Sequence, residues 1–195
     1  KCIASAGATF GNSGEVRLWD AGTGAELRVL KGHSETISAL AFHPDDTRIA
    51  TMHLARPPVL MTCDAGGAGG PVELFVPETP FGFASSCSPD GRYLLLGTQS
   101  EPGADVYLAD LEQRSTRPLL YAACAERAAV FSPDGKYIAY TSDESGRPEV
   151  YIAPFRSGAP VSDSLRVTKS SGANPYWSAD GRTLRYVDPG GRVMS

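Results

Sequence analysis

One turn sequence recurs along this chain at nearly even spacing. Ser88-Pro89-Asp90-Gly91 and Ser132-Pro133-Asp134-Gly135 are identical in type, and His43-Pro44-Asp45-Asp46 and Ser178-Ala179-Asp180-Gly181 are weaker copies. The turn aspartates at 45, 90, 134 and 180 are separated by 45, 44 and 46 residues. Proline presets the dihedral of the second turn position, while serine and glycine suit the first and fourth, so each copy predicts a type I turn. The chain is therefore one structural unit written several times.

Strand-forming segments flank these turns. Tyr93 to Thr98 and Tyr137 to Ser142 follow two of them and are rich in aromatic and β-branched residues. Val106 to Ala109 and Val150 to Ala153 then alternate in the manner of third strands. Self-similarity at about 40 to 45 residues is typical of propeller blades. We predict an all-β fold, a β-propeller of four-stranded antiparallel blades.

Aligning the turns divides the chain into units of one propeller segment, residues 1–195. About four blades are visible, three of them complete and two partial. The predicted boundaries are a partial blade at 1–35, complete blades at 36–79, 80–125 and 126–172, and a partial blade at 173–195. We expect a segment of a larger ring; a closed four-blade ring and two chains completing one ring are the alternatives. Open blade edges would favour self-association.

The repeated turn residues are expected to be structural. Their aspartates sit at the same position in separate blades, whereas a catalytic carboxylate pair requires a separation of about 5 to 9 Å. The predicted structural turn residues are Pro44, Asp45, Pro89, Asp90, Gly91, Pro133, Asp134, Gly135, Asp180 and Gly181.

The second half of the chain carries a family resemblance. Phe131 to Asp143, continuing through Glu149 to Phe155, resembles the WD40-like (PD40) repeat of TolB-type bacterial propellers. Pro175 to Leu184, with Gly191 to Met194, is similar to the end of propellers attached to bacterial serine/threonine protein kinases. The likeness covers about residues 80 to 195 and implies a propeller fold.

The first third of the chain resembles true WD40 repeats. Gly14 to Gly24 and Lys31 to His33 carry this likeness. In that family a histidine, a serine or threonine, an aspartate and the tryptophan form one hydrogen-bonded set within a blade. Here the tryptophan belongs to the first unit with Ser5, whereas the histidine belongs to the second, whose tryptophan position is Cys63, so no complete set is expected. The WD-like residues are Trp19, Asp20, Gly32 and His33.

Residue types that could carry chemistry do not form a recognisable set. The only three histidines, His33, His43 and His53, are spaced by ten, but the repeat register assigns them different heights in one blade, so we expect structural or exposed roles. The four cysteines form no CxxC pair, and Cys63 and Cys87 take positions that are apolar in other repeats. We predict no catalytic, cofactor-binding or metal-binding residues, and no cofactor.

The charge and hydropathy of the chain limit the classes of partner that it is expected to bind. A net charge of -4 and a pI of about 5.4 give no global reason to bind nucleic acid or an anionic membrane. The sequence contains no transmembrane run and no signal peptide pattern, although the chain starts at Lys1. The compartment, bacterial cytoplasm or periplasm, stays open.

These observations predict a non-catalytic WD40/TolB-like β-propeller module that mediates protein–protein interaction or scaffolding, with protein partners still to be identified. The alternative is the sensor or gating propeller of a larger enzyme, either a bacterial serine/threonine protein kinase or a prolyl-oligopeptidase-type hydrolase. The HRD and DFG triplets of kinases are absent, so the chain alone is not expected to be an enzyme.

Overall fold

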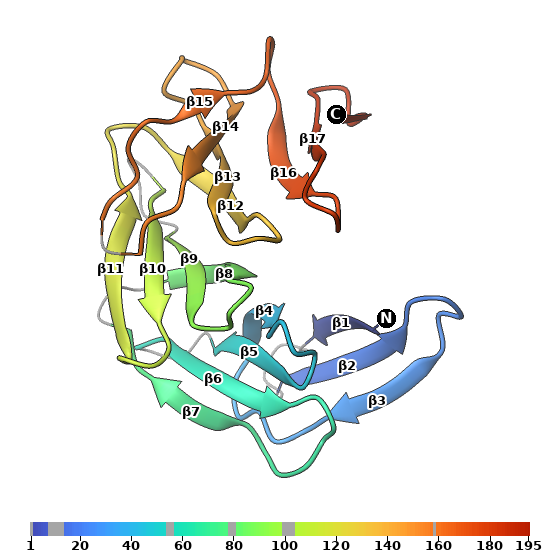
Figure 1. The fold of residues 1–195 in the computed structure, drawn as a ribbon. Helices are drawn as coiled ribbons and strands as arrows, with labels where there is room; N and C mark the ends of the chain where they lie inside the picture. The colour runs from blue at the N-terminus through green and yellow to red at the C-terminus, as the bar shows by residue number, and fades with distance from the viewer. Residues whose placement is uncertain (1, 8–13, 54–56, 78–80, 99–103, 158) are drawn as a thin grey trace.

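The structure, a computed structural model, describes residues 2–7, 14–53, 57–77, 81–98, 104–157 and 159–195. Regular secondary structure in these residues consists of β-strands arranged in five separate antiparallel sheets. The sheets follow one another around a common centre, each forming one blade of a propeller (Figure 1).

Each sheet is an up-and-down meander in which consecutive strands pair. The first contains β1 (Cys2–Gly7), β2 (Glu15–Asp20) and β3 (Glu26–Leu30). The second contains β4 (Ile37–Phe42), β5 (Arg48–His53), β6 (Val59–Asp64) and β7 (Val72–Phe75). The third contains β8 (Phe81–Cys87), β9 (Tyr93–Thr98), β10 (Val106–Asp110) and β11 (Ser115–Leu120). The fourth contains β12 (Glu126–Phe131), β13 (Tyr137–Ser142), β14 (Glu149–Pro154) and β15 (Leu165–Arg166). The fifth contains β16 (Ala173–Trp177), β17 (Leu184–Val187) and β18 (Val193–Met194).

The number of blades differs from the prediction. The described strands form five blades in a ring-like arrangement, so the prediction of about four was wrong. The difference comes from the two units predicted as partial, 1–35 and 173–195. Each forms a three-stranded sheet of its own, β1-β2-β3 and β16-β17-β18, and therefore counts as a blade. The exact blade boundaries stay a prediction.

The strands at the inner end of each meander contact one another from blade to blade, β1 with β4, β4 with β8, β8 with β12 and β12 with β16. In β4, β8, β12 and β16 the pairing register shifts once or twice. Such bulges bend a strand and increase its twist. Each inner strand is thus both a hydrogen-bonded edge of its own sheet and a contact surface for its neighbours.

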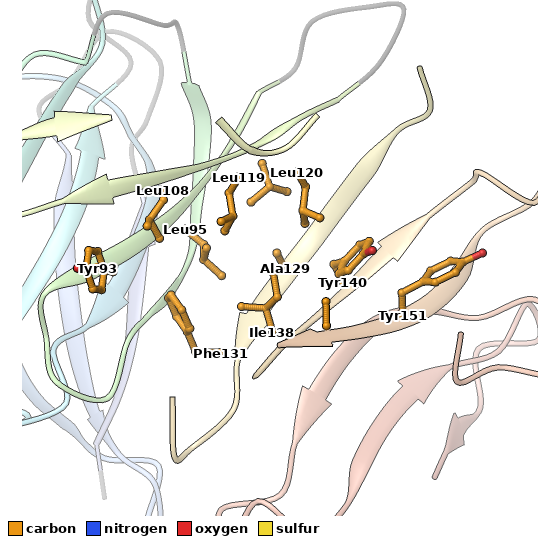
Figure 2. Packing of buried hydrophobic residues seen from close by; sticks show 12 residues of the cluster. Tyr93, Leu95, Leu108, Leu119, Leu120, Ala129, Phe131, Ile138, Tyr140 and Tyr151 are labelled. Atoms are coloured by element: carbon orange, nitrogen blue, oxygen red, sulfur yellow. The ribbon is translucent and has the colours of Figure 1, made fainter. Parts of the chain in front are cut away.

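Both faces of the third blade are buried. In β9, Leu94, Leu95 and Leu96 are all fully buried. Successive side chains of a strand point to opposite faces, so Leu95 packs toward Ile138 of the fourth sheet, while Leu94 and Leu96 pack toward Met52 of the second. Figure 2 shows the cluster between the third and fourth sheets, which includes Leu95 and Ile138. An unbroken apolar run therefore marks a strand covered on both sides.

Leu95→Ala is expected to lower the free energy of unfolding by about 2 to 5 kcal/mol, because it removes buried atoms and leaves a cavity between two blades. Leu165→Ala, at a leucine that is 69% exposed, serves as the matched control and should change stability by less than about 0.5 kcal/mol. Denaturant unfolding measures both, and equal effects would contradict this packing.

Candidate functional site

Three of the four repeated turns have the same hydrogen-bonded centre. In the turn at 88–91, the Ser88 hydroxyl donates to Asp90 Oδ1 at 2.5 Å and accepts from the backbone N–H of Tyr93 at 2.8 Å. Asp90 Oδ1 also accepts from the backbone N–H of Arg92 at 3.0 Å. These hydrogen bonds, that from Ser88 above all, lower the pKa of Asp90. Equivalent bonds join Ser132, Asp134, Lys136 and Tyr137, and Ser178, Asp180, Arg182 and Thr183.

The turn at 43–46 uses a histidine in place of the serine. His43 Nδ1 lies 2.8 Å from Asp45 Oδ1, and Asp45 also accepts from the hydroxyl and backbone N–H of Thr47 at 2.7 and 2.9 Å. The Thr47 hydrogen bonds are the main cause of the lowered pKa of Asp45. Each turn aspartate therefore uses its Oδ1 to stabilise its own turn.

The turns of neighbouring blades touch. Gly91 has a φ of +73° and lies directly against the His43 ring of the preceding turn. A Cβ on Gly135 would lie 3.3 Å from Pro89 Cδ, and one on Gly181 would lie 3.6 Å from Pro133 Cδ. The copies thus line up side by side on one face of the molecule, which we call the turn face. Predicted turn residues are brought together here as packing partners.

The WD-like residues lie in two places, Trp19 and Asp20 on β2 and Gly32 and His33 in the connection between β3 and β4. Trp19 on β2 donates its Nε1–H to the Ser5 hydroxyl on β1 at 2.8 Å. Asp20 Oδ1 accepts from the backbone N–H groups of Gly22 and Thr23 at 3.0 and 2.7 Å and so caps the turn before β3. Gly32 has a φ of +102° and lies against Pro71, which leaves no easy place for a side chain.

His33 and His53 form a buried pair that the sequence reasoning missed. His33 Nδ1 lies 2.8 Å from His53 Nε2, and the two residues are 1% and 2% exposed. The repeat register assigned the histidines different heights in one blade, but these two meet because β5 ends at His53, opposite Ile37, where the segment preceding β4 passes. Their structural or exposed roles stay a prediction. Burial, and then the neighbouring His53, lowers the pKa of His33 to about 4, and burial also lowers that of His53.

Metal and thiol chemistry find little support in this part of the chain. Within the described ranges, no group of three or more histidine, cysteine, aspartate or glutamate side chains is arranged to hold a metal ion. Cys2, Cys63, Cys87 and Cys124 are free thiols. Burial raises the pKa of Cys63 and of Cys87 to about 11, so both are protonated at neutral pH and behave as small apolar side chains.

Two hollows lie between blades. One of about 540 Å³ lies between the first two sheets and is lined by apolar Leu27 and Phe42 and by charged Arg28 and Asp64. Arg28 donates to the carbonyl oxygen of Gly66, which ties these two blades together. A smaller one of about 280 Å³ lies between the second and third sheets, beside the turns at 43–46 and 88–91.

An acidic pocket of about 470 Å³ lies at the end of the fourth blade that is remote from its turn at 132–135. It is lined by Ala123, Cys124, Asp143, Glu144 and Gly146. The Cys124 thiol donates to Glu126 Oε1 at 3.0 Å, while Glu126 Oε2 is buried without a hydrogen-bond partner among the described residues. Burial, reinforced by the charges of Asp105 and Asp143, raises the pKa of Glu126. The sequence does not predict this pocket, because Ala123 and Cys124 precede β12 whereas Asp143, Glu144 and Gly146 follow β13.

The described residues contain no helix with the length and apolar character needed to cross a bilayer.

Gly91→Ala is expected to destabilise the protein more than Gly181→Ala. Both glycines hold the same turn position with φ near +70°, but a methyl group at Gly91 would collide with the His43 ring, whereas one at Gly181 makes an ordinary contact. The left-handed strain, about 1 kcal/mol, is common to both, and the collision adds about 1 to 3 kcal/mol. Denaturant unfolding measures each change. His43→Ala in the Gly91→Ala background should restore most of the difference; no restoration would contradict the turn contact.

The His33–His53 pair predicts loss of stability in acid. A buried histidine with a lowered pKa binds a proton more readily in the unfolded chain. Its contribution is therefore intact above about pH 6.5 and is lost as the pH falls toward about 4, by up to about 3 kcal/mol for His33. His33→Gln should reduce the loss of unfolding free energy between pH 7.5 and 4.5. The turn histidine variant His43→Gln should show the same loss as the unchanged protein. Parallel profiles for the protein and His33→Gln would refute the assignment.

Comparison with known proteins agrees with the propeller geometry. WD repeat-containing protein SL1-17 of Schistosoma mansoni is 28% identical over 151 residues, covering 77% of this chain and 47% of the relative. TolB from Acinetobacter baumannii has a TM-score of 0.75 at 22% identity, over 98% of this chain and 48% of that one. The β-propeller domain of Cps50 (Swd1) from Myceliophteria thermophila has a TM-score of 0.64 at 16% identity, over 95% of this chain and 58% of that one.

This chain spans about half the length of the WD repeat relative and of the Acinetobacter TolB. The family model described as TolB beta propeller domain matches residues 6–194, so the match also includes the first third, where the WD40 likeness lies. The TolB-like, WD40-like resemblance is confirmed, and the chain belongs to the family of TolB β-propeller domains.

Proposed function

We propose that this chain is a non-catalytic propeller module that binds or scaffolds protein partners through one of its two faces. The observation that carries the proposal is the contrast between those faces. The turn face repeats one hydrogen-bonded structure from blade to blade and packs against itself. A surface whose polar groups are satisfied internally has little left to offer a partner.

The opposite face, which we call the loop face, consists of the other connections. In an antiparallel meander, the loops before the first strand and after the second emerge at the end remote from the turn. The described loop-face segments are 31–36, 104–105, 121–125, 143–148, 167–172 and 188–192. They share no common sequence, and they include the acidic pocket. Variable loops on a rigid scaffold are the usual place for recognition.

The candidate chemical groups favour binding over catalysis. The turn aspartates are held by their own serine or threonine side chains, and the His33–His53 pair is shielded from solvent. Neither set offers an accessible nucleophile beside a general base, which covalent catalysis requires.

The blade boundaries and the roles of individual residues are part of the same proposal. We place blades at 1–35, 36–79, 80–125, 126–172 and 173–195, and we assign structural roles to the repeated turn residues and to Trp19, Asp20, Gly32 and His33. The enzyme-associated alternative, a sensor or gating propeller of a larger kinase or hydrolase, stays a prediction, as does self-association through open blade edges.

Site-specific photo-crosslinking in the cells that produce the protein tests the choice of face. Benzoylphenylalanine at Tyr121, 58% exposed on the loop face, is expected to give discrete adducts with a protein partner. The same probe at Lys136, whose side chain is 75% exposed on the turn face, is the matched control and should give none. Adducts from Lys136 alone, or adducts of only the chain with itself, would contradict the proposal.

A further inference from the structure

We propose that the free edge of β1, in the first sheet, accepts a short extended segment of a protein partner, which adds to that sheet as an inner strand. The inference rests on the proposed interaction function and adds a second contact surface, separate from the loop face.

The pairing register shows that β1 occupies the place of a second blade strand. The strands β2, β6 and β10 each end in an aspartate, and these aspartates pair with the first residues of β1, β5 and β9. One residue further along, Ile3 of β1 pairs with Trp19, as Ile49 of β5 pairs with Cys63. The first sheet therefore begins with the strand that comes second in the other blades.

This second strand is paired on both sides in the other four sheets. An inner strand lies against it each time, in the pairs β4–β5, β8–β9, β12–β13 and β16–β17. In the described part of the chain, β1 pairs with β2 alone and forms the inner edge of its sheet (Figure 1). Such an edge presents a row of free backbone N–H and C=O groups, which an extended peptide can pair with.

The strand β1 is also far more exposed than its counterparts. None of its residues is buried, whereas every residue of β9 is buried, and so are all but the first residue of β5 and of β13. Ile3 is 54% exposed, and the residues at its position in the next three blades are fully buried, namely Ile49, Leu94 and Ile138. An exposed edge strand with an apolar side chain is a typical site of pairing with another chain.

The inner strands of the other blades indicate the chemistry of the added segment. The strands β4, β8 and β12 are six or seven residues long and contain no proline. In β4 and β8 no residue is charged, and β12 carries charge only at its first two residues, Glu126 and Arg127. A proline would remove a donor from the ladder, and charged side chains disfavour edge pairing. The segment that fits β1 is therefore short, extended, uncharged and free of proline.

A second copy of this chain is a poorer donor of such a segment. Its inner strands β4, β8, β12 and β16 already pair within their own sheets, so donating one of them would open a blade. The outer strands β15 and β18 are two residues long, which is too short to cover β1. These observations favour a strand from a different protein.

Fluorescence anisotropy and hydrogen exchange with the full chain test the proposal. The probe is a fluorescein-labelled peptide of residues 36–43, which contains the β4 sequence. The control peptide has proline at two successive positions, those of Ala39 and Leu40, so that one proline removes a donor that would face β1. We expect the probe to bind at least about tenfold more tightly than the control peptide and to slow amide exchange in β1.

A variant of β1 gives the matching test on the chain itself. Ile3→Lys should weaken binding of the probe about tenfold, because a charged side chain on an edge strand disfavours pairing. Leu165→Lys, on the outer edge strand β15 of the fourth sheet, is the matched control and should leave binding unchanged. Thermal unfolding checks that both variants are folded. If Ile3→Lys does not fold, exchange in β1 with and without the probe carries the test.

Equal binding of the two peptides, equal weakening by the two variants, or slow exchange in β1 of the chain alone would overturn the proposal. Dimers detected by light scattering, with protected β1 amides, would assign the edge to a second copy and would also overturn it. Photo-adducts of Tyr121 with a protein partner, together with equal peptide binding, would leave the interaction function standing and reject strand addition. Pairing of the probe with β1 without any loop-face adduct would support strand addition and reject the loop face.

Discussion

The burial of the third blade on both of its faces is the constraint on which the rest of this structure depends. A sheet with fully buried Leu94, Leu95 and Leu96 on one strand cannot stand alone, because either face would expose apolar side chains to water. The second sheet covers one face, through Met52, and the fourth covers the other, through Ile138. Stability is therefore shared between neighbouring blades, as in other repeat architectures.

The repeated turn adds order to this packing. Its serine and aspartate close each hairpin, and its glycine allows the next turn to lie against a proline or histidine of the one before. This contact packs the turns of neighbouring blades against one another on the turn face. The loops of the loop face do not make this contact. Their sequences can therefore differ from blade to blade, and they can carry charges that the chain itself does not neutralise.

The sequence predicted the features that are encoded within a single repeat. The spacing of Asp45, Asp90, Asp134 and Asp180 predicted the propeller and its four-stranded blades, since the turn and its flanking strands are local in the chain. The count of about four blades was too low, because the units predicted as partial, 1–35 and 173–195, each form a sheet of their own. Local patterns also say nothing of how a loop returns beside a strand end.

Contacts between segments that are distant in the chain are therefore the features of the candidate sites that the sequence did not predict. The contact between His33 and His53 depends on the path of residues 31–36, which the ten-residue spacing does not encode. The acidic pocket combines Asp143 with Cys124 from another segment, and their spacing in the sequence does not predict that they meet. Trp19 and Ser5 were assigned to one unit from their repeat register, and the structure joins them by a hydrogen bond.

Native-state hydrogen exchange tests two-sided burial most directly, by comparing Leu94→Ala with Leu95→Ala. The side chains of these adjacent residues enter different clusters, so the account predicts that Leu94→Ala lowers amide protection chiefly in β5 and β6. Leu95→Ala should instead lower it chiefly in β13 and β14. The same protection losses in both variants, or losses confined to β9 and its own sheet, would contradict the claim that the third blade is stabilised by both of its neighbours.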